Sequence, residues 1–100
     1  MAKRLVWSPS ALECIDKIAE YIAIDSLFYA KAFVRNIFNL GNQILLFPEA
    51  GRIVPEVDDK VIREVIYGNY RVVYRIDKSI INILAVANSA QLLVIADLNN

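Results

Sequence analysis

The sequence contains no histidine and only one cysteine. Without an imidazole, neither a Ser-His-Asp triad nor a histidine general base can be built, and a Cys/His metal cluster is excluded as well. A single cysteine cannot make a disulfide framework, which is typical of a reducing cytoplasm. Cys14 falls inside a helical pattern and has no imidazole to activate it, so we expect an inert packed thiol. With no glycine-rich phosphate loop either, we expect neither a metal nor a cofactor.

Long hydrophobic runs and an excess of either charge are also missing. The chain has 11 basic and 11 acidic residues and a pI near 6.2, which is not the broad basic footprint of a nucleic-acid-binding protein. The longest apolar stretch, from Ile80 to Ala96, is interrupted by polar residues from Asn82 onward, so no membrane span is expected. Lys3 and Arg4 are followed by too few apolar residues for a signal peptide. We expect a cytoplasmic protein.

Apolar residues, by contrast, make up 57% of the chain, above the roughly 45–50% that is usual for globular proteins. In a domain of 100 residues, part of this surplus is expected on the surface, where apolar patches usually mark a partner. The length predicts one domain, residues 1–100.

The periodicity predicts an α+β fold in the order β-α-α-β-β-β, with a helical hairpin packed on a small, mainly antiparallel sheet. A short strand over 3–7 precedes a helix that Ser8 caps and that runs to about Ile24. Ser26 caps a second helix, over 27 to about 46, which reads either as a central helix covered by its neighbours or as a docking surface. A polar connection over 52–59 with acids at 56, 58 and 59 follows, and strands fill 60–87. Residues 90–98 form a further helix or strand.

Gly68-Asn69 is the signal that fixes the sheet register. A type II′ turn there sets Tyr67 opposite Tyr70 and leaves two faces. The first is richer in large apolar groups and should pack on the helices: Val61, Arg63, Val65, Tyr67, Tyr70, Val72, Tyr74 and Ile76. The second is mixed and should face outward: Ile62, Glu64, Ile66, Arg71, Val73 and Arg75.

Arginines provide the remaining candidates for chemistry. Arg71 and Arg75 on the outward face could clamp a phosphate or stabilise charge in phosphoryl transfer. They could equally form exposed cross-strand ion pairs with Glu64, each contributing well under ~1 kcal/mol. Arg63 lies on the face that should pack, so we expect it to be a buried structural cation, hydrogen-bonded to the backbone or to a carboxylate.

Several motifs occur in a familiar order. Ser8-Pro9, the Phe47-Pro48 to Gly51-Arg52 element with Pro55-Glu56, Ile62-Arg63-Glu64, and the run 69–76 (NYRVVYRI) together resemble the RelE/ParE superfamily of toxins from toxin–antitoxin modules. The resemblance covers nearly the whole chain. It implies a toxin that a cognate antitoxin neutralises. The RelE-like branch cleaves mRNA on the ribosome, whereas the well-studied ParE-like members inhibit DNA gyrase.

The residues favour the ParE-like branch. The nuclease branch carries basic residues where this chain has Ile62 and Glu64, and only the arginine matching Arg71 is kept. Each missing stabilising donor would cost roughly 3–4 kcal/mol of transition-state stabilisation. The stretch 87–93 also lacks the His and Arg common in ParE-like members, which leaves an altered target or a loss of toxicity open. The alternatives are a ribosome-dependent RNase using Arg71, Arg75 and Arg63, or an inactive family member.

The resemblance implies protein partners. They are the antitoxin, a gyrase or ribosome target, and a second copy of the chain. Candidate target- or phosphate-contacting residues are Arg71, Arg75 and Glu64. Candidate antitoxin-binding residues are the apolar side chains Phe38, Leu45, Ile62, Ile66, Val73, Leu92 and Leu93.

Overall fold

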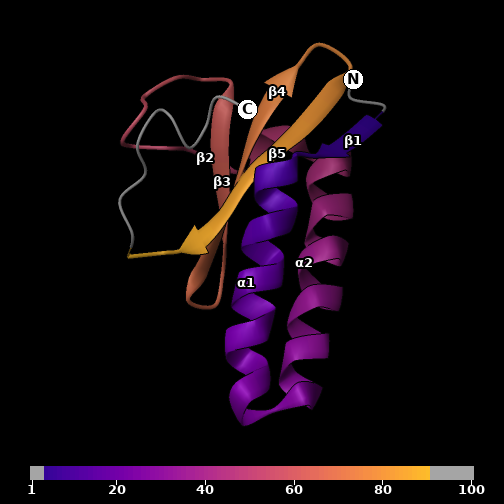
Figure 1. Cartoon of the computed structure of the whole chain (residues 1–100). Helices are drawn as coiled ribbons and strands as arrows, with labels where there is room; N and C mark the ends of the chain where they lie inside the picture. The colour runs from indigo at the N-terminus through magenta and orange to yellow at the C-terminus, as the bar shows by residue number, and fades with distance from the viewer. Residues whose placement is uncertain (1–3, 91–100) are drawn as a thin grey trace.

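Two long helices and a five-stranded sheet form the chain, which a computed structural model describes from residue 4 to residue 90 (Figure 1). The elements in chain order are β1 (Arg4–Trp7), α1 (Pro9–Asp25), α2 (Leu27–Leu46), a 3₁₀ turn (Pro48–Ala50), β2 (Arg52–Ile53), β3 (Ile62–Tyr67), β4 (Tyr70–Asp77) and β5 (Ile80–Asn88). The predicted α+β class, element order and helical hairpin are confirmed.

The sheet has the strand order β1-β5-β4-β3-β2. Strand β1 pairs parallel to β5, and all other pairs are antiparallel. Strand β2 corrects the sequence prediction, which had only a polar connection over 52–59. Arg52 lies opposite Glu64 and Ile53 opposite Arg63, so two residues of that connection complete the sheet. Two residues are too few to show a strand periodicity, and only the open edge of β3 determines where they pair.

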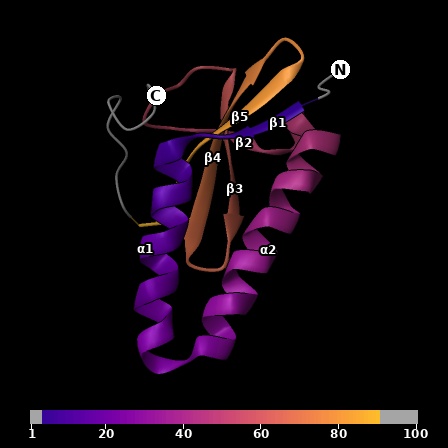
Figure 2. The same ribbon diagram turned by 45° about the vertical axis from the view of Figure 1, so that its right-hand side comes forward.

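Serine caps set the helix starts as predicted. The Ser8 hydroxyl accepts a hydrogen bond from Ala11 N at 3.0 Å, and Pro9 occupies the first helical position. The Ser26 hydroxyl accepts from Tyr29 N at 3.1 Å and begins α2 directly after α1. The two helices therefore lie side by side as a hairpin, and their turn extends beyond the end of the sheet in both ribbon views (Figures 1 and 2).

The β3–β4 hairpin has the predicted register. All six predicted pairs, from Tyr67–Tyr70 to Ile62–Arg75, are present, and Gly68 takes a φ of 58°. The next turn, Lys78-Ser79, joins β4 to β5, with Lys78 at a φ of 38°. Turn chemistry thus decides which side chains share a face of the sheet.

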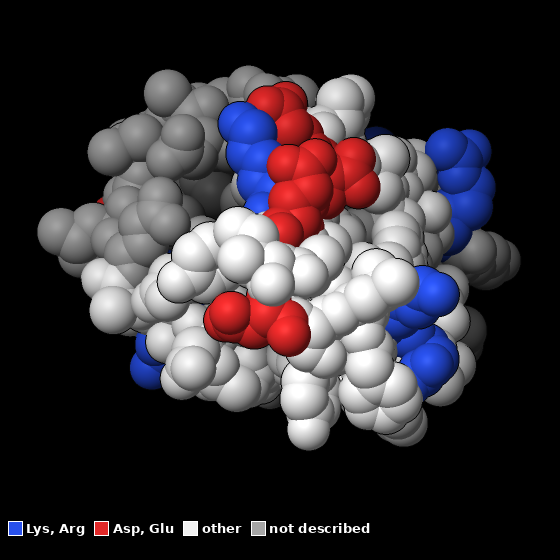
Figure 3. All heavy atoms as spheres, turned by 60° about the horizontal axis from the view of Figure 1, so that its bottom comes forward, with Lys and Arg blue, Asp and Glu red and all other residues white. Residues whose placement is uncertain are grey.

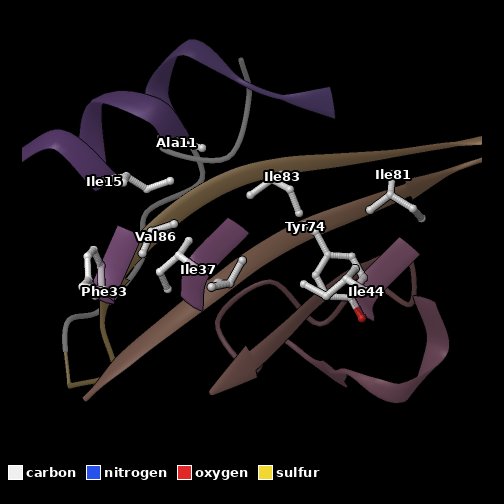
Figure 4. Packing of buried hydrophobic residues seen from close by; sticks show 10 residues of the cluster. Ala11, Ile15, Phe33, Ile37, Ile44, Tyr74, Ile81, Ile83 and Val86 are labelled. Carbon is white, nitrogen blue, oxygen red and sulfur yellow. The ribbon is translucent and has the colours of Figure 1, made fainter. Parts of the chain in front are cut away.

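The face predicted to pack on the helices does so. Its main cluster joins both helices to β4 and β5, and Figure 4 shows the helix residues Ile37 and Ile44 beside Val86 and Tyr74 of the sheet. The Phe33 and Tyr70 rings lie 5.0 Å apart between α2 and β4. This cluster fixes the position of the hairpin on the sheet.

The opposite face differs from the prediction, because it is not simply turned outward. The segment that follows β2 packs over it and makes a second apolar cluster. Leu84 is the extra residue of a bulge in β5, opposite the Val73/Tyr74 step of β4. The cluster consists of Val54, Ile62, Val73, Leu84, Ala85 and Ala87, with Val57 packed against it. Strand β5 is consequently buried on both sides.

No helix within residues 4–90 is long and apolar enough to cross a membrane. The predicted helix or strand over 90–98 falls almost wholly outside the described residues, as do Leu92 and Leu93.

Candidate functional site

The predicted polar residues of the outer sheet face meet in one ion-pair cluster. Glu64 of β3 and Arg71 of β4 are diagonal neighbours, and Glu64 Oε1 accepts from Arg71 Nη1 at 2.9 Å. Their side chains are 0% and 4% exposed. The sequence pattern predicted exposed side chains here. The cover supplied by the segment after β2 is what buries them.

Two further described charges, those of Arg52 and Glu56, belong to the cluster. Arg52 of β2 donates from Nε to Glu64 Oε2 at 2.5 Å. Glu56, in the segment after β2, accepts hydrogen bonds from both terminal nitrogens of Arg71. Nη1 lies 3.2 Å from Oε1, and Nη2 donates to Oε2. Glu56 was expected only as an acid of the polar connection over 52–59, but its side chain is 20% exposed and ion-paired. The two-pronged geometry of a guanidinium suits this bidentate contact.

Among the described residues, two arginines of the cluster face two carboxylates. The hydrogen bond that Arg71 donates to Glu56, together with the hydrogen bond to Glu64 and the charge of Glu64, raises the pKa of Arg71 above its ordinary value despite burial. Arg71 therefore stays cationic and is held by two carboxylates. The arrangement ties the segment after β2 to the sheet.

Arg75 lies apart from this cluster. The predicted pairing with Glu64 is wrong, because Arg75 Nε donates instead to Asp77 Oδ2 at 2.8 Å. The same carboxylate oxygen accepts from Asn82 Nδ2 at 2.6 Å. Arg75 is four residues from Arg71 along β4, or about 13 Å at the usual rise of a strand.

Arg63 is the structural cation that its place on the packed face predicted, although it is half-buried rather than fully buried. It donates to three backbone carbonyls, those of Lys60 at 3.0 Å, Gly51 at 3.0 Å and Glu49 at 3.3 Å. These bonds hold the 3₁₀ turn against β3. Tyr74 supports the same turn.

The three candidate arginines therefore do not converge. Arg63 lies on the helix side of the sheet, while Arg71 and Arg75 lie on the other side and are bound to different carboxylates. No group of three or more His, Cys, Asp or Glu within residues 4–90 could hold a metal ion.

The candidate antitoxin-binding residues are dispersed over the fold. Ile62 and Val73 are buried in the second cluster, and Phe38 and Leu45 are half-buried, with the Phe38 ring 4.6 Å from that of Trp7. Ile66, at 48% exposed, is the described candidate most open to a partner.

A different apolar surface, not predicted from the sequence, lies at the turn of the helical hairpin. Its side chains are between 61% and 80% exposed, and Figure 3 shows uncharged surface over much of this end of the molecule, beside acidic and basic groups. The signal was available, because these large apolar residues fall outside the core stripes of their helices. This apolar tip consists of Tyr21, Ile24, Leu27, Phe28 and Tyr29.

The fold and the motifs agree with one family. Residues 5–93 match the family described as the ParE toxin of the type II toxin–antitoxin system parDE. The chain belongs to the ParE toxin family. The five-stranded sheet and its helical hairpin are therefore those of a ParE toxin.

A solved structure shares the fold. The chromosomal ParDE toxin–antitoxin system from P. aeruginosa contains a chain that superposes with a TM-score of 0.71 at 18% identity. The match covers 88% of this chain and 96% of the other. A search of the curated proteins finds no match. At this identity the superposition shows the ParE fold alone.

Proposed function

We propose that this ParE-family chain arrests growth by binding a target such as DNA gyrase, without cutting RNA, and that a cognate antitoxin neutralises it. Gyrase and the ribosome, the two candidate targets, both work in the cytoplasm, where the thiol of Cys14 would stay reduced.

The observation that carries the proposal is the state of the arginines. Ribonucleolytic cleavage without histidine needs several cations aimed at one phosphate. Here Arg71 is held by Glu56 and Glu64, and Arg75 is bound to Asp77. Arg63 is committed to backbone carbonyls on the other side of the sheet. Such an arrangement suits a rigid scaffold for binding better than a phosphoryl-transfer site.

Exposed apolar side chains support the binding role. The outer sheet face offers Ile66, and the end of α2 offers Leu46 and Phe47, which are 71% and 68% exposed. An antitoxin that laid an apolar segment over Ile66 would cover one of the candidate antitoxin-binding residues. A second copy of the chain is a further partner that we propose, on different surfaces.

Inducible expression in a cell that lacks the module tests the proposal. Growth, transcript integrity and plasmid supercoiling are followed in the same culture, with and without the neighbouring antitoxin reading frame. We expect arrest with intact transcripts and altered supercoiling, relieved by the antitoxin. Purified protein should then inhibit gyrase and leave ribosome-bound mRNA uncut.

Two results would overturn the proposal. Transcripts cleaved at the onset of arrest, with cleavage lost in Arg71→Ala, would make the chain a ribosome-dependent RNase. No arrest in cells that accumulate folded protein would make it an inactive family member.

The antitoxin surface has its own test. Ile66→Asp places a charge on the outer sheet face. It should weaken antitoxin binding at least about tenfold, because the new carboxylate would lose its hydration against an apolar partner. Leu12→Asp is the matched control, since it changes a similarly exposed apolar residue, at 41%, on α1. Equal binding of wild type and Ile66→Asp would exclude this face.

A further inference from the structure

A groove of about 510 Å³ runs between α1 and α2 on the surface of the helical hairpin. The α1 side is formed by two rows of residues spaced four apart. Ala19 and Ala23 line the floor of the groove, and Asp16 and Glu20 form its wall. One more step of four along the wall leads to Ile24 of the apolar tip, which is 80% exposed.

The α2 side mirrors this arrangement with the opposite charge. Ala30 and Val34 line the floor, while Lys31 and Arg35 form the wall. That wall begins at Leu27, another residue of the apolar tip. The groove thus has an apolar floor, one acidic wall and one basic wall. The view onto the tip shows acidic groups over the middle of the molecule and basic groups at its right, with uncharged surface between them (Figure 3).

Within residues 4–90 the wall residues have no ion-pair partner, although the charge of Glu20 acts on the neighbouring Lys17 of the same helix. These wall residues are Asp16, Glu20, Lys31 and Arg35. Glu13 and Lys17 of α1 form an ion pair with each other, and neither residue lines the groove. An occupant that fits this groove would carry an apolar surface between a basic row, facing the acidic wall, and an acidic row, facing the basic wall.

We propose that a second copy of this chain occupies the groove, with a two-fold axis parallel to the helices. Such an axis sets α1 of one copy against α2 of the other. Both copies then lie at the same height along the helix axes. An axis across the helices would instead set α1 against α1 and place acid against acid. Only the parallel axis makes the surface self-complementary.

Height along the hairpin specifies the contacts. Because the helices are antiparallel and joined at residues 25–26, residues equally far from that turn lie level with each other. Ile24 then meets the partner's Leu27, Glu20 meets the partner's Lys31, and Asp16 meets the partner's Arg35. Each contact occurs twice by symmetry.

The driving force and the specificity come from different residues. Desolvation of the groove floor and of part of the apolar tip favours association. Exposed ion pairs add little affinity but strongly disfavour the wrong register, where like charges meet. The small floor residues let the two hairpins approach closely. The inference does not depend on which cellular target the toxin has.

Complementary charge variants of the full-length chain test the dimer. Asp16→Lys/Glu20→Lys makes both walls basic, and Lys31→Glu/Arg35→Glu makes both walls acidic. By sedimentation equilibrium, each variant alone should dimerise at least about tenfold more weakly than wild type, because all its wall contacts become repulsive. A mixture of the two should form a one-to-one dimer at least as tight as that of wild type, which also shows that both variants fold.

The control exchanges charges elsewhere on α1. Glu13→Lys/Lys17→Glu reverses the ion pair outside the groove and should leave dimerisation unchanged. The proposal is overturned if the wild type stays monomeric at high micromolar concentration. It is also overturned if the mixture fails to associate, or if the wall variants lose antitoxin binding while the wild type remains a monomer, which would assign the groove to the antitoxin.

Discussion

Glu64→Gln is the most informative single change in this ParE-family chain. The substitution keeps the shape of a side chain that is 0% exposed and removes its charge. Glu64 now accepts from Arg71 at 2.9 Å and from Arg52 at 2.5 Å, one bond to each carboxylate oxygen. A glutamine amide has one oxygen, so one of the two arginines would face an NH₂ group instead of an acceptor.

The expected loss follows from what remains around Arg71. Removing one partner of a buried ion pair costs about 3–5 kcal/mol when the other charge is left uncompensated. Here Glu56 still neutralises Arg71, so the loss should be closer to the ~1.5–3 kcal/mol of one hydrogen bond to a charged group. We expect Glu64→Gln to lower the free energy of unfolding by about 2–3 kcal/mol. That corresponds to a fall in Tm of roughly 10–20 °C for a domain of this size.

Urea unfolding followed by circular dichroism measures this loss. Arg52→Gln is the matched control, because it breaks the other bond to Glu64 at a side chain that is 63% exposed and should cost less than about 1 kcal/mol. A loss below about 0.5 kcal/mol for Glu64→Gln, or one equal to that of Arg52→Gln, would refute the buried-cluster reasoning. Unchanged m-values would show that both variants unfold from the same compact state.

Two further predictions concern the core. The buried Tyr74 hydroxyl donates to Pro48 O at 2.5 Å and accepts from Gly51 N at 3.2 Å, so Tyr74→Phe should cost about 1–3 kcal/mol in urea unfolding at neutral pH. Burial raises the pKa of Tyr74 above its ordinary value of 10.0. The wild type should therefore lose stability as the pH rises above about 10, and the gap to Tyr74→Phe should narrow there; a constant gap would contradict the assignment. Gly41→Ala should destabilise by about 1–3 kcal/mol, although helix propensity alone predicts a gain of about 1 kcal/mol, because the new Cβ would lie 2.4 Å from Trp7 Cζ2; a rise in Tm would contradict this packing.

Local chemistry allowed the sequence to determine the helices and one hairpin. The Ser8 and Ser26 caps bond to amides only three residues away, so both helix starts could be read from neighbours in the chain. Gly68-Asn69 set the pairing of β3 with β4, and with it the two faces of the sheet. These features need no information from distant residues. Family motifs then carried the assignment to ParE toxins.

Tertiary structure decided what lies on those faces. One partner of Arg71 is Glu56, 15 residues away in a segment whose path no local signal reveals. The same folding brings Arg52 to β3, covers Val73 and removes the expected exposed arginine site. Gly41 likewise acquires its role only when the Trp7 ring packs on it. Long-range contacts select one partner among many compatible residues, and sequence periodicity carries no information about that choice.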